Sequence, residues 1–410
     1  MKIKFELLII SITIIINLVF GVLFQKQLTH NDGLGWDGRD YYKVALDFKN
    51  NTTPTARAPF VYRMGTPFLV SYFFPNDLQF GFKLINLSFS VLVFFVLWYF
   101  LLVAGTNSIL RVLLLISYIT YWQNPMRMTF FYPVHSDPIA VFFLFINLIL
   151  AYRYYLNNDI KYLIFLALST LLSAFFREIT LIPAVVLILS NIKFQSKYRL
   201  IFEFKLIIPL IAGFVTIIFT HLVAQTTDTY NFFNSAISWI YRKSTIMYIH
   251  SILLSVGPIA VLGFYFYKDF YKFLVENKFI LYFLVLILFV SYAGGSDTER
   301  LIMWGAPGIY LVLANVIYTN KQQLMSKFLI TVLIITQLIS NRLFLITPDY
   351  NENALSAFPF LTPFTSDFRV LDLWVIHANS RFIIISAIEY AIVSVLVIFL
   401  IKYLNKLKQN

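Results

Sequence analysis

The 410-residue sequence contains no cysteine and few charged residues. The absence of cysteine excludes a disulfide framework, an iron–sulfur site, a cysteine-ligated zinc site and a cysteine nucleophile. Charged residues make up 13% of the chain, whereas soluble globular proteins carry roughly 25%. Hydrophobic residues make up 59% and the mean hydropathy is +0.76. The chain therefore has lipid as its main solvent, and an ordinary soluble domain or a disordered chain is excluded.

The common signatures of nucleotide and hydrolase chemistry are also absent. No H-E-x-x-H, P-loop, G-x-G-x-x-G or G-x-S-x-G pattern occurs, so nothing supports a nucleotide-driven enzyme or a serine hydrolase. The net charge is +12, but the basic residues are scattered between apolar runs. That distribution suits anionic headgroups, and we expect membrane lipids as partners and no nucleic acid.

Twelve apolar stretches predict a single all-α polytopic membrane domain over residues 1–410. A crossing helix needs about 20 apolar residues, and three stretches are shorter, so the expected number is 10–12. The first stretch lacks a small-residue cleavage site and is interpreted as an uncleaved anchor. The predicted spans are 5–24, 79–104, 108–121, 136–155, 161–176, 178–191, 206–224, 246–267, 279–295, 300–319, 328–346 and 382–402.

Lys and Arg are concentrated in the segments that are cytoplasmic if the N-terminus is inside. We therefore expect a multi-pass plasma (inner) membrane protein with both termini cytoplasmic. Two long extracytoplasmic loops follow, 25–78 and 347–381. The first contains an amphipathic stretch over 36–48 that predicts an interfacial helix, and a second short helix over 65–74. The last carries prolines and aromatic residues (Pro348, Phe358, Pro359, Phe360, Pro363, Phe364 and Trp374), which predict a loop on the headgroup layer.

The first polar cluster, Trp36-Asp37-Gly38-Arg39-Asp40-Tyr41, follows the first span. On a helix, Asp37 and Asp40 are three residues apart and share a face. Two such carboxylates can hold a divalent cation, or one can act as a general base. The alternative is a solvated first turn in which acidic residues favour the helix dipole.

Two further clusters border predicted spans. His135-Ser136-Asp137-Pro138 begins the span at 136–155, where Ser136 or Asp137 before Pro138 also suits a helix cap. Arg177-Glu178 separates two short apolar runs. A charged pair at that depth should face a water-filled cavity or a partner, and Arg177 can bind a phosphate as a planar fork. A self-paired turn is the alternative.

The fourth cluster, Asp297-Thr298-Glu299-Arg300, precedes another span, where Arg300 alone would suit interface snorkelling. All four clusters fall on the extracytoplasmic side of the predicted topology. They combine carboxylates, which suit base or metal chemistry, with arginines, which suit phosphate. A phosphorylated lipid carrier at the outer leaflet is the predicted substrate.

These motifs resemble the GT-C superfamily of integral-membrane glycosyltransferases. Trp36-Asp37-Gly38…Tyr41-Tyr42…Ala45 is similar to the W-D-(G/A)-x-x-Y-x-x-I-A pattern of the mannosyltransferase-like branch, which includes the second mannosyltransferase of GPI-anchor assembly and bacterial relatives. Ala58-Pro59-Phe60-Val61-Tyr62-Arg63…Pro67 resembles the P-F-x-Y-R-x-L-x-P stretch of bacterial members. Ser136-Asp137-Pro138, Arg177-Glu178 and Asp297-Thr-Glu-Arg300 resemble later acidic, R-E and D-x-x-R elements. Residues 320–410 match no motif.

The resemblance implies a GT-C-like fold and an inverting transfer of a sugar from a polyprenyl-phosphate donor to a glycan, lipid or protein acceptor. Asp37 or Asp40 would be the general base. The resemblance also implies that Arg177, Arg300 and Arg63 bind the donor phosphate. A Mg or Mn ion, if used, would be held by Asp37, Asp40 and Asp137. The substrate-positioning residues would be His135, Asp137, Glu178, Asp297, Glu299 and Tyr41.

Two rival functions stay open. A flippase or transporter for a lipid-linked sugar predicts charges through the middle of spans and often internal repeats. Only Lys83 and Glu389 lie well inside predicted spans, and no repeat is visible. A polysaccharide polymerase or ligase fits the same arginines and aspartates as a single-sugar transferase.

Overall fold

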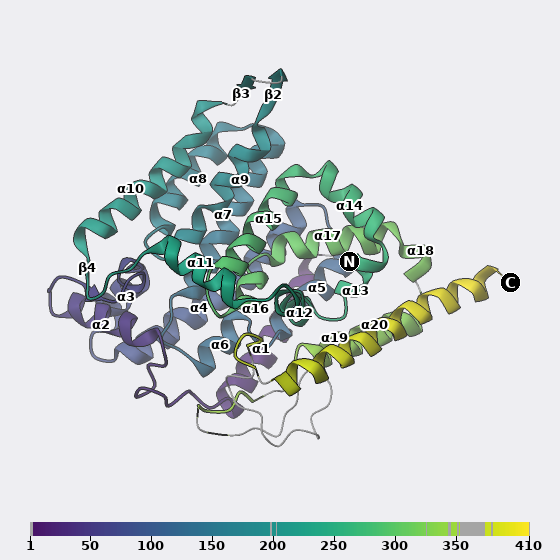
Figure 1. Cartoon of the computed structure of the whole chain (residues 1–410), viewed down its shortest axis with the longest axis horizontal. Coiled ribbons are helices and arrows are strands. Elements are labelled where there is room, and N and C mark those ends of the chain that lie inside the picture. The colour runs from purple at the N-terminus through teal and green to yellow at the C-terminus, as the bar shows by residue number, and fades with distance from the viewer. Residues whose placement is uncertain are drawn as a thin grey trace.

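The computed structural model describes residues 3–196, 199–201, 203–324, 326–342, 346–350, 352, 374–378 and 380–409 (Figure 1). Within these residues the chain is almost entirely helical, and its few strand residues form two short two-stranded pairs. The predicted all-α class is confirmed.

Long apolar helices form the frame of the described chain. Five of these helical segments are long and apolar enough to cross a membrane, and a sixth arises if α14 (Tyr267–Glu276) and α15 (Lys278–Ala293), bent by 108°, count as one span. They indicate a membrane protein. The five are α1 (Ile3–Phe24), α4 (Leu78–Val103), α7 (Asp137–Asn157), η3 (Phe204–Ile207) continued by α10 (Ile208–Val223), and α20 (Ser380–Gln409).

The other predicted spans correspond to shorter helices. Two of those spans are not continuous helices, which corrects the sequence prediction. Residues 246–267 are interrupted at Gly257, whose φ is +79°, and Pro258, which has no N–H to donate. Residues 300–319 break at Trp304–Gly305. The shorter helices are α5 (Ser108–Thr120), α8 (Ile160–Ser173), η2 (Glu178–Leu181), α9 (Ile182–Asn191), α12 (Thr245–Val256), α13 (Ala260–Tyr265), α16 (Thr298–Met303), α17 (Ala306–Thr319) and α19 (Lys327–Ser340).

Short elements connect the frame. α2 (Gly38–Lys49) and α3 (Gly65–Phe73) confirm the two short helices predicted in the first long loop. β1 (Thr55–Ala56) pairs in parallel with β4 (Gln225–Thr226), which ties this loop to the segment after α10. The remaining elements are η1 (Phe60–Tyr62), α6 (Pro125–Phe131), the antiparallel pair β2 (Lys193–Ser196) and β3 (Arg199–Ile201), α11 (Phe232–Arg242) and α18 (Lys321–Leu324).

The helix α7 lies at the centre of the bundle, where it packs against α4, α8 and α9. Its buried Asn147 donates hydrogen bonds to Ser173 Oγ at 3.1 Å and to the Thr180 carbonyl oxygen at 2.9 Å. Aromatic side chains such as Phe94 and Phe283 fill the core around it. The outward faces of α8, α10 and α20 expose Leu, Ile, Val and Phe, as expected for helices that contact lipid.

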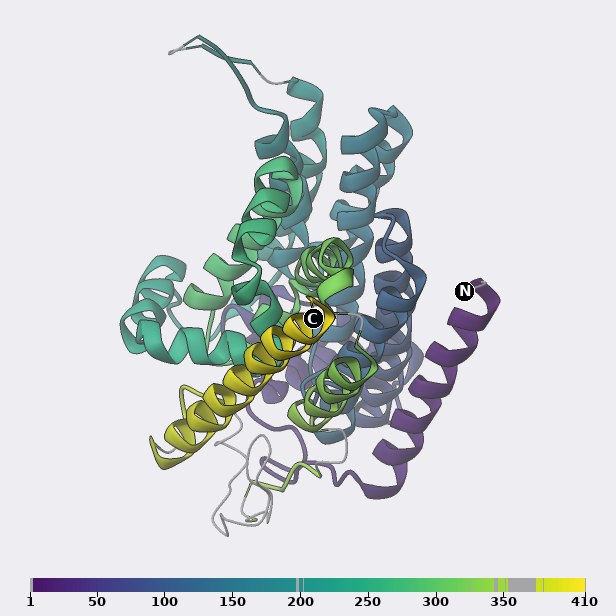
Figure 2. The same cartoon turned by 90° about the vertical axis from the view of Figure 1, so that its right-hand side faces the viewer.

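The helix α1 lies at the margin of the bundle (Figure 2). Its buried Glu6 carboxylate accepts hydrogen bonds from Arg111 Nη2 at 2.7 Å and Nε at 2.8 Å, and from Trp98 Nε1 at 2.9 Å. The Arg111 guanidinium also donates to the Thr106 carbonyl oxygen. This bidentate pair is the main polar link between α1 and the bundle.

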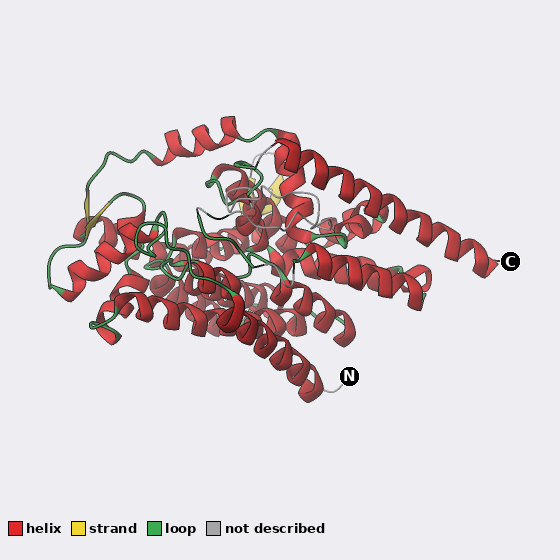
Figure 3. Ribbon diagram, turned by 90° about the horizontal axis from the view of Figure 1, so that it is seen from below, coloured by secondary structure: helices red, strands yellow, loops and turns green. Residues whose placement is uncertain are grey.

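Both chain ends lie on the same side of the molecule (Figures 1 and 3). The helix α2 and strand β4 lie at the opposite end in Figure 1. Most of the predicted 347–381 loop, including Phe358, Pro359, Phe360, Pro363 and Phe364, falls outside the described residues. Its described ends contact the segment after α1: Asp349 accepts from the Thr29 N–H at 2.9 Å, and Glu352 pairs with Lys26 at 2.9 Å.

Candidate functional site

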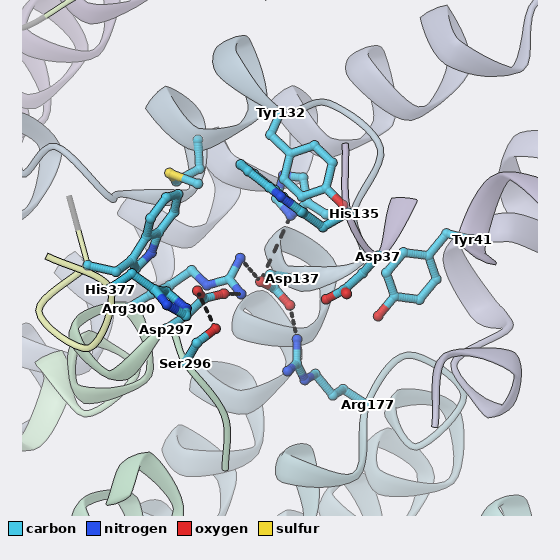
Figure 4. A pocket seen from close by; sticks show the side chains of 13 residues that line it. Asp37, Tyr41, Tyr132, His135, Asp137, Arg177, Ser296, Asp297, Arg300 and His377 are labelled. Atoms are coloured by element: carbon cyan, nitrogen blue, oxygen red, sulfur yellow. Dashed lines mark hydrogen bonds and ion pairs between the residues drawn. The ribbon is translucent and has the colours of Figure 1, made fainter. Parts of the chain in front are cut away.

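A cavity of about 210 Å³ lies where the start of α2, the α6–α7 junction, the start of η2 and the α15–α16 connection meet (Figure 4). Segments far apart in the sequence therefore build one site. The lining residues are Trp36, Asp37, Tyr41, Met128, Tyr132, His135, Asp137, Arg177, Ser296, Asp297, Arg300, Trp374 and His377.

The Trp36-Asp37-Gly38 segment is held tightly against the loop between α6 and α7. The Gly38 N–H donates to the Tyr132 hydroxyl oxygen at 2.6 Å, and a β-carbon at Gly38 would lie 2.6 Å from the Val134 carbonyl oxygen. Glycine is therefore required at this close approach. The contact fixes Asp37, the residue directly before α2, in the lining of the cavity.

The Asp37 carboxylate has no hydrogen-bond or ion-pair partner among the side chains and backbone that the structure describes. Its residue is half-buried. Burial and, next, the nearby Asp297 charge raise the pKa of Asp37 to about 6, while Arg300, Arg63 and Arg177 pull it in the opposite direction. A carboxyl group with this pKa can take up and release a proton near neutral pH.

Asp137 is the centre of the charged part of the cavity. One carboxylate oxygen contacts Arg177 Nη1, and the other forms an ion pair with Arg300 Nη1 at 2.6 Å. Arg300 also pairs with Asp297. Because the side chains of Asp137 and both arginines are largely buried, each charge depends on the others for compensation.

Arg177 retains hydrogen-bonding capacity toward the cavity. Its guanidinium lies 4.7 Å from the centre of the Trp304 ring, a cation–π arrangement that fixes the plane of the fork. Within the described structure, Asp137 is its only side-chain acceptor. A guanidinium carries five N–H donors, so donors of Arg177 are left for an anion in the cavity.

His135 is buried beside this cluster. Its Nε2 lies 3.2 Å from Thr129 Oγ1, and its Nδ1 is 4.0 Å from an Asp137 oxygen. Burial lowers the pKa of His135 to about 4, against the opposing effect of Asp137, and the two arginines lower it further. The imidazole is therefore neutral at physiological pH. Asn86 fixes the backbone here by donating to the Pro133 and His135 carbonyl oxygens.

The structure places Asp37 and Asp40 differently, which corrects the expectation of two carboxylates sharing one face. The Asp40 carboxylate lies away from the cavity and pairs with Arg57 Nη2 at 2.6 Å. It also accepts the Arg57 backbone N–H at 3.2 Å. A long-range partner in the loop after α2 thus takes Asp40 out of the site.

Three other predicted site residues, Arg63, Glu178 and Glu299, do not line the cavity. Arg63 pairs with Glu178 at 3.3 Å, and its Nη1 lies 3.5 Å from the hydroxyl oxygen of Tyr41, which does line the cavity. Arg177 and Glu178 therefore have separate partners and do not form the self-paired turn. Glu299 does not line the cavity and accepts a hydrogen bond from Ser251 at 2.8 Å.

Several lining residues had no predicted role: Trp36, Met128, Tyr132, Ser296, Trp374 and His377. Trp36, Tyr132 and Ser296 lie within the predicted polar clusters or beside them. Their position next to those clusters could have identified them as site residues. The sequence predicts Trp374 only as an aromatic residue of a loop on the headgroup layer, whereas the structure buries it in the cavity lining. His377 carried no signal, because it reaches the cavity from the same distant loop.

No group of three or more His, Asp or Glu side chains suited to a metal ion occurs in the described part of the chain. The predicted trio of Asp37, Asp40 and Asp137 is not assembled, because Asp40 lies with Arg57. What the cavity offers is a carboxyl group with a raised pKa close to guanidinium donors.

Comparisons with known proteins do not extend this description. No family model, no curated protein and no solved structure matches the chain.

Proposed function

We propose that the protein is an inverting membrane glycosyltransferase of GT-C-like fold that moves a sugar from a polyprenyl-phosphate carrier to an acceptor. One observation carries the proposal. An unpartnered carboxyl group with a pKa of about 6, Asp37, shares a small cavity with Arg177, which has N–H donors to spare. A base beside an anion-binding fork is what the displacement of a phosphate by a hydroxyl group requires.

In this mechanism the Asp37 carboxylate takes the proton of an acceptor hydroxyl group. The freed oxygen attacks the anomeric carbon of the donor sugar from the face opposite the phosphate. The bond between that carbon and the phosphate oxygen breaks, and the phosphate leaves with the electron pair. Attack from the opposite face inverts the anomeric configuration.

The arginines would stabilise the negative charge that grows on the departing phosphate. The fork of Arg177 is oriented by Trp304 and Asp137, so it needs little rearrangement during the reaction. Arg300 is fixed by Asp137 and Asp297 and adds positive charge at the cavity wall. Arg63 contacts the Tyr41 hydroxyl oxygen and Glu178. It would act on the phosphate only through its positive charge.

The same proposal includes the topology. We place the protein in the plasma (inner) membrane with ten to twelve spans, both termini in the cytoplasm and the cavity on the extracytoplasmic side. The placement of both termini on the side away from α2 and β4 supports it (Figure 1). The basic residues of the predicted cytoplasmic segments support it as well.

The test uses purified full-length protein in nanodiscs with a panel of polyprenyl-phosphate sugars and crude lipid and glycan acceptors. Release of free polyprenyl phosphate is measured for the wild type, Asp37→Asn and the matched control Asp40→Asn, with folding checked by thermal melting. We expect release by the wild type, loss of at least a hundredfold in Asp37→Asn, since general-base catalysis contributes about 10²–10⁴-fold, and a smaller loss in Asp40→Asn.

Two results would contradict the proposal. If Asp37→Asn releases polyprenyl phosphate as fast as Asp40→Asn does, the base lies on another loop. No release from any donor would favour a flippase, which predicts movement of the intact lipid-linked sugar between leaflets.

A further inference from the structure

The cavity has a second side whose chemistry the proposed mechanism does not use. Besides the charged residues, the lining includes the aromatic side chains of Trp36, Tyr132 and Trp374, and that of His377. In the view of Figure 4, His377 lies on the other side of Asp137 from Asp37 and Tyr41. The cavity therefore has both charged and aromatic side chains in its lining.

The aromatic side chains hold one another in place. Trp36 makes edge-to-face contacts with Tyr132, at 5.7 Å between ring centres, and with Trp374, at 5.8 Å. Trp374 also packs against Trp122 at 6.5 Å. Offset and edge-to-face pairs of this kind are the favoured geometries of aromatic rings. Three segments that are distant in the sequence thus present a fixed apolar surface next to Asp37.

The buried Glu299 carboxylate fixes the segment that carries Trp374. Its Oε1 accepts the backbone N–H of Val375 at 3.1 Å and the hydroxyl of Ser251 at 2.8 Å. Ser255 donates to the Glu299 carbonyl oxygen at 3.1 Å. Glu299 itself does not line the cavity. Its contacts link α12 and α16 to the residue directly after Trp374.

A pyranose ring matches this combination of surfaces. Its C–H groups form apolar faces that pack on aromatic rings, and its hydroxyl groups form a polar edge that donates to carboxylates. A free phosphate or a metal ion has no apolar face and would use only the charged lining. Because Trp36 and Asp37 line the same cavity of about 210 Å³, a ring that packs on Trp36 can present its hydroxyl edge to the Asp37 carboxylate.

We propose that Trp36, Trp374 and His377 form the subsite for a pyranose ring of the acceptor, and that Glu299 is the positioning residue that holds Trp374 there. The acceptor is then a glycoside, free or lipid-linked, and not a protein side chain. The assignment to the acceptor rests on the proposed function, whereas the binding of a sugar ring by this subsite does not.

The first experiment measures binding without any donor, so it is independent of turnover. Full-length protein in nanodiscs is titrated with methyl glycosides of mannose, glucose, galactose and N-acetylglucosamine, and binding is followed by saturation-transfer NMR. We expect at least one glycoside to bind the wild type. Trp374→Ala should weaken glycoside binding by about two- to tenfold, the range of a lost aromatic contact, and Trp374→Phe should retain most of the affinity. Trp239→Phe, in α11 outside the cavity, is the control.

The positioning role of Glu299 is tested by two measurements, the affinity for the glycoside and the fluorescence of Trp374. Glu299→Ala should lower the affinity for the glycoside and change the fluorescence of Trp374, identified by difference from Trp374→Phe. Glu299→Gln retains an acceptor oxygen for the Val375 N–H and should restore both signals. A loss of binding in Glu299→Ala with unchanged Trp374 fluorescence would overturn the positioning role.

The subsite is overturned if no glycoside binds the wild type or if Trp374→Ala binds as well as the wild type does. If transfer activity is found with a hydroxyl-bearing peptide and is insensitive to Trp374→Ala, the assignment to a glycoside acceptor fails while the transferase stands. If a glycoside binds through Trp374 but no donor supports transfer, the subsite stands and the proposed reaction fails.

Discussion

The Gly38 N–H donates a hydrogen bond to the Tyr132 hydroxyl oxygen at 2.6 Å, across 94 residues of sequence. This bond joins the segment that carries Asp37 to the loop that carries His135 and leads into Asp137. A contact between one backbone group and one side chain therefore helps to hold Asp37, the proposed base, near the arginine cluster.

Replacing Gly38 with alanine should displace Asp37. The added β-carbon would lie 2.6 Å from the Val134 carbonyl oxygen, a contact that only movement of the backbone can relieve. Overpacking of this kind typically costs about 1–3 kcal/mol, and we expect a lower melting temperature together with a loss of polyprenyl-phosphate release. In Gly263→Ala the β-carbon would meet no atom closer than 3.4 Å, so that variant should behave like the wild type. Equal melting temperatures for both variants would argue against the tight contact at Gly38.

Replacing Asp137 with asparagine should destabilise the protein strongly. The change leaves the largely buried Arg177 and Arg300 without their shared counter-charge, and breaking a buried pair in this way typically costs about 3–5 kcal/mol. Thermal unfolding in detergent measures the effect. In Asp159→Asn the exposed pair with Lys161 is lost, and the melting temperature should barely change. A similar shift in both variants would mean that the Asp137 cluster is well solvated.

The rate of transfer should fall below about pH 6, with a tenfold loss for each further pH unit, because the base must be ionised and burial raises the pKa of Asp37 to that value. His135, whose pKa is about 4, is neutral between pH 5 and 8 and does not cause this decline in rate. A pH–rate profile of kcat/KM from pH 5 to 8 measures it. Asp40→Asn should show the same decline, and a kcat/KM that stays constant down to pH 5 would exclude Asp37 as the base.

The raised pKa also predicts the sign of a stability effect. The folded state holds the Asp37 proton more tightly than the unfolded state does, so this group loses stabilising free energy as the pH rises from about 4 through about 6. The melting temperature of the wild type should therefore fall relative to that of Asp37→Asn over this interval. A difference that stays constant from pH 4 to 7 would contradict the raised pKa.

Lysine in place of Arg177 should reduce the stabilisation of the transition state, although the positive charge is kept. The ammonium group cannot present a planar fork over Trp304 or bind a phosphate bidentately. Loss of one charge-assisted hydrogen bond is worth about 1.5–3 kcal/mol, which predicts a fall in kcat/KM of about ten- to hundredfold. Arg39→Lys, on the exposed side of α2, is the matched control. An unchanged kcat/KM in Arg177→Lys would remove the phosphate role.

The sequence predicted the helical class and the helices α1, α4 and α7, because long apolar runs have few alternatives in lipid. It did not predict the breaks at Gly257 and Gly305. Hydropathy alone predicts one continuous helix for a run of apolar residues, even where proline and glycine interrupt the backbone hydrogen bonds. Tertiary packing decides whether the helix bends or ends at such a point.

The candidate site was predictable in part. The clusters around Asp37, Asp137, Arg177 and Arg300 were recognisable, because ionisable residues at span boundaries need partners, and the structure brings them to one cavity. The partners themselves were not predictable. The pairing of Asp40 with Arg57 and the approach of Trp374 depend on how loops fold back, which local spacing does not encode.

The bidentate pair of Glu6 with Arg111 has a consequence for the order of events during synthesis. The two residues are 105 positions apart, so the carboxylate of α1 has no guanidinium partner until α5 has also been made. An uncompensated charge in lipid is costly. Of the two helices α1 is made earlier, but this ion pair can hold it to the bundle only once α5 has been made.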